Sequence, residues 1–186
     1  MLVEKYYGSP KSEYILNYDP QIINVAIHIR RGDVKSDNQF WEKFTDNGYI
    51  LRVLQKVLNI IASHGIETIV CVYSEGEGKD FKELQNLNAR FFLNEDPFTT
   101  FNNLVCADVL ILSKSTFSYT AGLLSNGIVF YEPFWHRPQA NWIKVKESAK
   151  FNPKEFSRKL AGYLSERQCL NNGAAKIVDA EDPYRE

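Results

Sequence analysis

The sequence predicts an α/β domain in which a parallel β-sheet carries helices on both faces. Two observations lead to this prediction. Segments with strand character alternate with segments of helical character along most of the chain, and this order is typical of parallel α/β folds. The strands are also continuous apolar runs, without alternation of apolar and polar residues. Such runs indicate a sheet that is buried on both sides.

The individual elements follow from local patterns. The expected strands cover residues 22–30, 67–78, 89–94, 107–115 and 127–133. The expected helices cover residues 49–63, 79–88, 96–107, 116–125 and 153–166. In the first helix, apolar residues recur every three or four positions along one face. The last helix should begin at an Asn variant of the capping box, Asn152 with Glu155, and Phe151 can staple onto Phe156.

The chain has 186 residues, which suits one domain with a substantial core. We divide it into a polar, aromatic lead-in over residues 1–20, an α/β domain over 21–168 and a tail over 169–186. Residues 1–20 are expected to be either a simple lead-in or a remnant of a preceding domain. The tail is polar and aperiodic, so we expect it to be flexible.

Composition excludes several classes of partner. The formal net charge is −1, from 22 basic and 23 acidic residues, so no bulk field draws the chain to nucleic acid or to an anionic membrane. No apolar run approaches the roughly 18 residues of a membrane span. Cys71, Cys106 and Cys169 are odd in number and lack metal-ligand spacing, and "MLVEKYYGSPK" does not resemble a signal peptide. We therefore expect a cytoplasmic protein with no nucleic-acid partner and no membrane span.

The first strand ends in an unusual group of polar residues. In "VAIHIRRGDV", His28, Arg30, Arg31 and Asp33 follow or interrupt a buried apolar run. In open parallel sheets, ligands bind outside the carboxyl ends of the strands. These four residues are therefore candidates for a ligand site.

A second polar group follows the strand at 107–115. In "LSKSTFSYTAG", Ser113, Ser115, Thr116 and Ser118 surround a helix start, where free N–H groups and the helix dipole favour an anion. An ordinary helix cap would need only one of these hydroxyls. Arginine binds phosphate oxygens through a planar fork, so both groups together predict a diphosphate site. The chain lacks a G-x-G-x-x-G after its first strand, and "SEGEGKD" does not fit the phosphate-loop pattern.

Three motifs carry a family resemblance. "HIRRGD" resembles the first motif of fucosyltransferases that use GDP-fucose, namely the α1,2 and α1,6 enzymes and the protein O-fucosyltransferases. "ADVLILSKSTFSYTAGLLS" resembles their later motif, and "VYSEGEG" occupies the place of a strand ending in Ser or Thr and acidic residues. Order and spacing agree over about residues 22–135. The α1,2 enzymes are Trp-rich where this chain has "FSYTAG", so the motifs do not identify the linkage.

The resemblance implies a fold and an activity. These enzymes are of the GT-B type, with two Rossmann-like halves and the active site between them, and the chain resembles the donor-binding half. It implies a glycosyltransferase of glycan biosynthesis that binds GDP-fucose or a related nucleotide-sugar and transfers the sugar with inversion to a glycan or protein hydroxyl. Only about twenty residues precede the matching stretch. We therefore expect the acceptor half to be missing, reduced or supplied by a partner chain, with self-association as another outcome. The alternative function is an inactive nucleotide-sugar-binding or scaffold domain.

The resemblance also implies residue roles. Arg30 clamps the β-phosphate, His28 lies against the nucleotide, and Arg31 either reaches the phosphates or braces the loop. Asp33 orients the arginines. The catalytic residues would be Arg30 and a general base, either Asp37 or Glu42. The other nucleotide-sugar-binding candidates are Ser74, Glu75, Ser115, Thr116, Phe117 and Ser118. No Asp-x-Asp signature is present, so we expect no metal ion and no other cofactor.

Other segments have competing interpretations. "RGD" at 31–33 is a cell-adhesion tripeptide, which would need an exposed loop. "PFWHRP" at 133–138 either lines the donor pocket or forms a loop anchored by its aromatic residues. We expect His64 to end a helix, and Asp108 to have a structural role.

Overall fold

The computed structural model describes residues 2–8, 16–19, 21–37 and 39–180. It contains a six-stranded sheet with the order β3-β2-β1-β4-β5-β6, and all neighbouring strands are parallel. This is the strand order of the Rossmann fold, and it confirms the predicted α/β class. The strands are β1 (Ile23–Ile29), β2 (Thr68–Ser74), β3 (Ala89–Leu93), β4 (Val109–Ile111), β5 (Ile128–Tyr131) and β6 (Ile143–Lys144).

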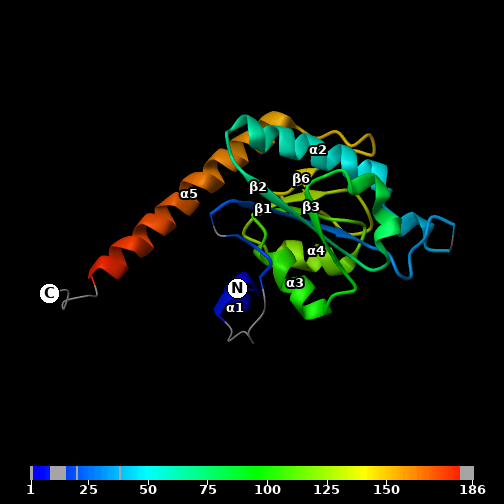
Figure 1. Ribbon diagram of the computed structural model, residues 1–186, viewed down its shortest axis with the longest axis horizontal. Helices are drawn as coiled ribbons and strands as arrows, with labels where there is room; N and C mark the ends of the chain where they lie inside the picture. The colour runs from blue at the N-terminus through cyan, green and yellow to red at the C-terminus, as the bar shows by residue number, and fades with distance from the viewer. Residues whose placement is uncertain (1, 9–15, 20, 38, 181–186) are drawn as a thin grey trace.

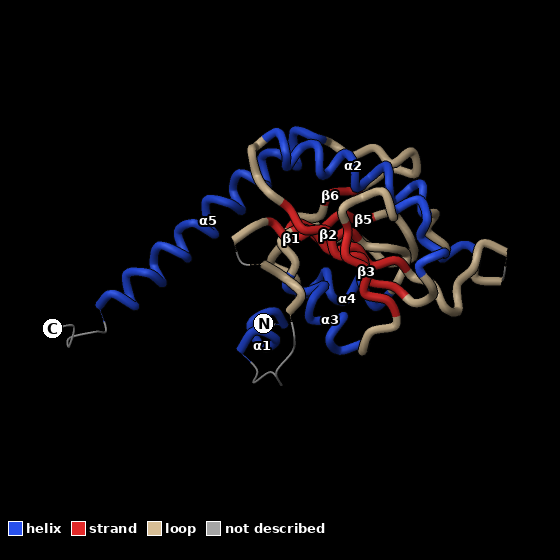
Figure 2. The backbone as a smooth tube through the Cα atoms, in the orientation of Figure 1, coloured by secondary structure: helices blue, strands red, loops and turns tan. Residues whose placement is uncertain are grey.

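Helices cover both faces of the sheet (Figure 1). One face carries α2 (Asn47–Ser63) and the start of α5 (Pro153–Ala180); the other carries α3 (Pro97–Cys106) and α4 (Thr116–Leu124), with α1 (Leu2–Gly8) beside them. The strands form a single layer between these helices (Figure 2). Within the described residues, no helix combines the length and the apolar character that a membrane span requires.

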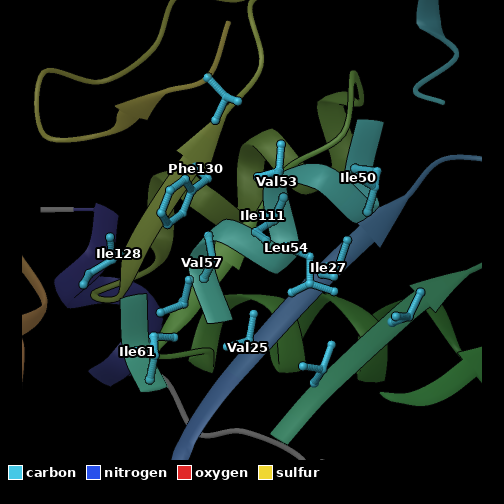
Figure 3. Close-up of a cluster of buried hydrophobic side chains, with 14 of the residues drawn as sticks. Val25, Ile27, Ile50, Val53, Leu54, Val57, Ile61, Ile111, Ile128 and Phe130 are labelled. Carbon is cyan, nitrogen blue, oxygen red and sulfur yellow. The ribbon is translucent and has the colours of Figure 1, made fainter. Parts of the chain in front are cut away.

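The two faces of the sheet bury separate apolar clusters. Successive strand residues point to opposite faces, so Val25 and Ile27 pack toward α2, whereas Ala26 packs toward α3 and α4. The cluster beneath α2 also contains Leu54 and Phe130, both fully buried (Figure 3). A rigid sheet supported from both sides holds the ends of its strands in place.

Asn152 caps the start of α5, which is one half of the predicted capping box, and the predicted contact between Phe151 and Phe156 is present. Asn152 Oδ1 accepts the backbone N–H groups of Lys154 and Glu155 at 3.1 and 3.2 Å, and the rings of Phe151 and Phe156 lie 6.2 Å apart. His64 is the C-terminal cap of α2, as predicted. At the other end of α2, Asp46 accepts the N–H of Tyr49 at 2.9 Å. That cap starts the helix two residues earlier than expected.

Several elements differ from the sequence prediction. Strand β6 was not predicted because two residues are too few for a periodic pattern. The segment expected as a helix at 79–88 is a 3-10 helix, η2 (Gly78–Leu84), and a further one, η1 (Trp41–Lys43), precedes α2. Helix α5 continues to Ala180, so the predicted tail from residue 169 begins inside a helix. Most residues of this segment are compatible with a helical conformation. Residues 181–186 lie outside the described part of the chain.

Candidate functional site

A cavity of about 510 Å³ lies at the carboxyl ends of the central strands. Strand β1 has β2 on one side and β4 on the other, so this is the topological switch point where α/β proteins bind ligands. Except for Ser118, the predicted nucleotide-sugar-binding residues all line the cavity: His28, Arg30, Arg31, Asp33, Ser74, Glu75, Ser115, Thr116 and Phe117. The structure thus brings together three segments that are far apart in sequence.

Arg30 presents a guanidinium fork at the end of β1. Its Nη2 and Nε donate to the two carboxylate oxygens of Asp33 at 2.7 and 3.2 Å, and this hydrogen bonding lowers the pKa of Asp33. Gly32 lies between them with φ of +71°, and a Cβ there would come 2.1 Å from Glu75 Oε2. The tight turn therefore requires glycine. The contact agrees with the predicted role of Asp33 in orienting Arg30.

His28 is a neutral side chain in the cavity wall. Burial, followed by the charges of Arg30 and Arg31, lowers its pKa to about 4. Its Nδ1 lies 3.1 Å from Ser113 Oγ, and its ring lies 5.4 Å from the ring of Phe117. The imidazole therefore connects β1 to the segment after β4 without adding a charge near pH 7.

Arg31 braces the loop after β1. Its Nη2 donates to the carbonyl of Thr45 at 3.0 Å and to Asn47 Oδ1 at 2.5 Å, and its guanidinium lies 4.3 Å from the centre of the Phe44 ring. Of the two predicted roles, bracing the loop is the one that these contacts support. The side chain is also buried, so the tripeptide at 31–33 is not displayed as an adhesion loop would require.

The start of α4 offers backbone donors to the cavity. The first N–H groups of a helix have no partner within the helix, and the N-cap residue Ser115 makes no capping hydrogen bond through its side chain. Ser118 does not line the cavity. It is fully buried, and its hydroxyl lies 3.5 and 3.4 Å from the carbonyls of Ser113 and Ser115, so it supports the turn.

The β3 side of the cavity was missed in the sequence. Asn94, Glu95, Pro97 and Thr100 line it. Asn94 is the last residue of the strand predicted at 89–94, and the other three follow that strand. Applying the carboxyl-end rule to that strand would have found them. With Glu75 after β2, Glu95 places carboxylates on the β2–β3 side, whereas Arg30 and the start of α4 supply donors on the β1–β4 side. One part of the cavity therefore suits an anion, and the other suits groups that donate hydrogen bonds.

The predicted general bases lie away from this cavity. Asp37 lines a neighbouring cavity of about 510 Å³, which shares Arg31 with the first. Glu42 belongs to η1 and is exposed. Neither lines the cavity that contains Arg30, so their role as a base stays a prediction. Within the described residues, no three His, Cys, Asp or Glu side chains group as metal ligands would.

The segment at 133–138 is an anchored loop. The ring of His136 stacks on Tyr119 at 4.5 Å, and its Nε2 lies 3.0 Å from Thr116 Oγ1. Trp135 is 51% exposed. The anchored interpretation therefore agrees with the contacts, and His136 touches a residue of the cavity wall.

Asp108 lies at the opposite, amino end of the sheet. Its Oδ2 accepts the backbone N–H of Asn24 at 2.7 Å, and its Oδ1 lies 3.2 Å from Arg167 Nη1. The residue joins β1, β4 and α5, which agrees with the predicted structural role.

The fold and the cavity together define a Rossmann-like α/β protein with a ligand cavity at its switch point. No protein-family model matches the chain, and no curated protein matches it in sequence. Among solved structures, it is similar to a crystal structure of POFUT1 in complex with GDP-fucose, with 15% sequence identity and a TM-score of 0.35. The match covers 64% of this chain and 40% of that chain, so it spans about two fifths of that protein. At these values the similarity carries no argument about this chain, and function has to be inferred from the residues of the site.

Proposed function

We propose that the chain is a glycosyltransferase domain that binds GDP-fucose or a related nucleotide-sugar in the cavity at the switch point. The observation that carries this proposal is that Arg30, His28 and the start of α4 line one cavity. A guanidinium fork and free helix N–H groups both suit phosphate oxygens. The motif "HIRRGD", which resembles that of GDP-fucose-using enzymes, supports this choice of ligand.

The proposed reaction is an inverting transfer without a metal ion. The bond between the sugar carbon and the β-phosphate oxygen breaks, a glycan or protein hydroxyl attacks the same carbon, and GDP leaves. Arg30 and the N–H groups of α4 stabilise the charge that grows on the diphosphate without having to reorganise. A carboxylate must take the proton of the acceptor hydroxyl. Asp37 and Glu42 remain candidates, and Glu75 and Glu95 join them because they line the cavity.

A second candidate function is a nucleotide-sugar-binding domain without turnover. It is favoured by the positions of Asp37 and Glu42, neither of which lines the cavity. Such a domain would bind the donor through the same residues, and a transfer assay separates it from an enzyme.

The proposal keeps the expected partners and location: a nucleotide-sugar donor, a glycan or protein acceptor, and the cytoplasm.

The protein is expected to bind GDP more tightly than guanosine, both in excess EDTA and in added Mg²⁺. A hydrogen bond to a charged group is worth about 1.5–3 kcal/mol, which corresponds to roughly 10- to 150-fold in affinity. Isothermal titration calorimetry with both ligands under both conditions measures this difference. Equal affinities for GDP and guanosine would refute the phosphate site, and a strict requirement for Mg²⁺ would refute metal-independent binding.

The isolated 186-residue chain is expected to bind the donor but to transfer its sugar slowly or not at all. Transfer needs an acceptor hydroxyl held in line with the leaving diphosphate, and such positioning supplies roughly 7–11 kcal/mol of a barrier. Trp41, Phe98 and Trp135 are 61%, 71% and 51% exposed on segments after β1, β3 and β5. These exposed aromatic side chains are where we expect an acceptor-bearing partner or a second copy to bind.

Size-exclusion chromatography with light scattering, beside a radiolabelled GDP-fucose transfer assay on mixed acceptors, tests both parts. A strict monomer with rapid transfer would contradict the prediction. In the lead-in, Tyr6 and Tyr18 pack against the cluster beneath α3 and α4, whereas Tyr7 is 41% exposed.

A further inference from the structure

Glu132 is a buried carboxylate just after the carboxyl end of β5. It is 8% exposed and does not line the cavity. Its Oε1 lies 3.2 Å from Lys114 Nζ, and its Oε2 accepts a hydrogen bond from Thr45 Oγ1 at 3.2 Å. Neither the motifs nor the proposed reaction gives this residue a role.

Both partners of Glu132 are connected to residues that line the cavity. The carbonyl of Thr45 accepts from Arg31 Nη2 at 3.0 Å, and Arg31 Nη1 donates to the carbonyl of Arg30 at 2.8 Å. Lys114 lies between Ser113, which contacts His28, and Ser115, the N-cap residue of α4. One carboxylate thus joins the loop after β1 to the turn between β4 and α4.

We propose that Glu132 is a positioning residue: with Thr45 and Lys114 it holds Arg30 and the start of α4 so that both face one ligand. The identity of that ligand rests on the proposed function. The contacts themselves do not depend on it.

Fold stability does not account for this carboxylate. Burial raises the pKa of Glu132 against the opposing effects of Lys114 and Thr45. A raised pKa means that the folded protein binds the proton more strongly, so this contribution to stability is present at low pH and is lost as pH rises through the folded pKa. Replacing a buried ion pair by apolar residues of similar volume is often neutral or stabilising. The pairing of Glu132 with Lys114 and Thr45 is therefore better explained by what it positions.

Two variants separate positioning from stability. Glu132→Gln keeps the size of the side chain and an acceptor for Thr45 but removes the attraction to Lys114. The double variant Glu132→Leu with Lys114→Met replaces the whole pair by apolar side chains. Glu147→Gln is the matched control, because Glu147 is an exposed carboxylate in the electrostatic surroundings of Glu132.

Three measurements are made on each variant: the thermal unfolding midpoint, hydrogen–deuterium exchange without ligand, and GDP affinity by calorimetry. In the double variant we expect an unchanged or higher unfolding midpoint and faster exchange at residues 39–47 and 113–118. We also expect GDP binding to be about 10-fold weaker, which is the lower end of the effect that outer-shell partners have at metal sites. We expect Glu132→Gln to change in the same direction and Glu147→Gln to match the wild type.

The pH dependence of GDP affinity is a readout that a purely structural role of Glu132 would not alter. The charged and titratable groups acting on Glu132 are Lys114, Glu147 and Tyr49. Protonated Glu132 resembles Gln, so the ratio of wild-type to Glu132→Gln affinity should approach one as pH falls through the raised pKa. His28, Asp33 and the phosphates of GDP titrate in both proteins, so they cancel in the ratio.

Each outcome is decisive. Unchanged exchange in both variants, or a lower unfolding midpoint that accompanies weaker binding, would overturn the positioning role. Absence of GDP binding by the wild type would refute the proposed function instead, and the exchange comparison would still decide whether Glu132 orders the two segments.

Discussion

Replacing Arg30 by Ala is expected to weaken GDP binding by about 10- to 150-fold while the protein stays folded. The range corresponds to the 1.5–3 kcal/mol of a hydrogen bond to a charged group. Arg30 is the more accessible guanidinium of the cavity, because Arg31 is buried and donates to Thr45 and Asn47, whereas the partner of Arg30 is the exposed carboxylate of Asp33. Its pair with Asp33 lies near the surface, and such pairs contribute less than about 1 kcal/mol to stability.

Calorimetric titration with GDP measures the loss. Arg30→Lys keeps the charge without the planar fork, so an affinity between those of the wild type and Arg30→Ala is expected. Arg158→Ala is the control, since Arg158 is an exposed arginine on α5. A folded Arg30→Ala variant with wild-type affinity for GDP would rule out the diphosphate assignment.

Replacing Gly127 by Ala is expected to lower the free energy of unfolding by about 3 kcal/mol or more. A Cβ at Gly127 would lie 2.2 Å from the carbonyl oxygen of Ala107 and 2.7 Å from that of Asp108. Overpacking costs about 1–3 kcal/mol and occasionally more, and backbone atoms at the start of a central strand have little freedom to move. Gly127 therefore permits the close approach of the start of β5 to the residues before β4.

The matched control is Gly162→Ala. Gly162 lies within α5, and a Cβ there would meet no atom within 4 Å. Alanine in a helix interior is favoured over glycine by about 0.8–1.0 kcal/mol, so this variant should be more stable than the wild type. Urea denaturation of the two variants compares them directly, and equal shifts of the same sign would contradict the contact argument.

Much of the fold and part of the site were predictable from local patterns. A continuous apolar run such as that before His28 indicates a strand buried on both faces, and the order of strands and helices indicates a parallel sheet. Once the sheet is parallel, residues that follow its strands meet at one edge. For that reason His28, Arg30, Ser74 and Thr116 could be assigned to one site before the structure was known.

Other features depend on contacts that no local pattern encodes. Sequence alone left open whether Arg31 reaches a phosphate or braces its loop. The contacts of Arg31 with Thr45 and Asn47, which the packing of α2 on the sheet brings near, support bracing. Strand β6 has two residues, so it forms only as an addition to an existing edge.

The chain by itself determined the parallel sheet and the polar ends of its strands, because apolar runs and polar breaks act over a few residues. Only the tertiary structure decided which of these polar groups share a cavity and what holds them there. The contact between Glu132 and Thr45 spans 87 positions in the sequence. Its formation depends on the order in which β1, β4 and β5 pair, and that order is settled by packing of the whole sheet.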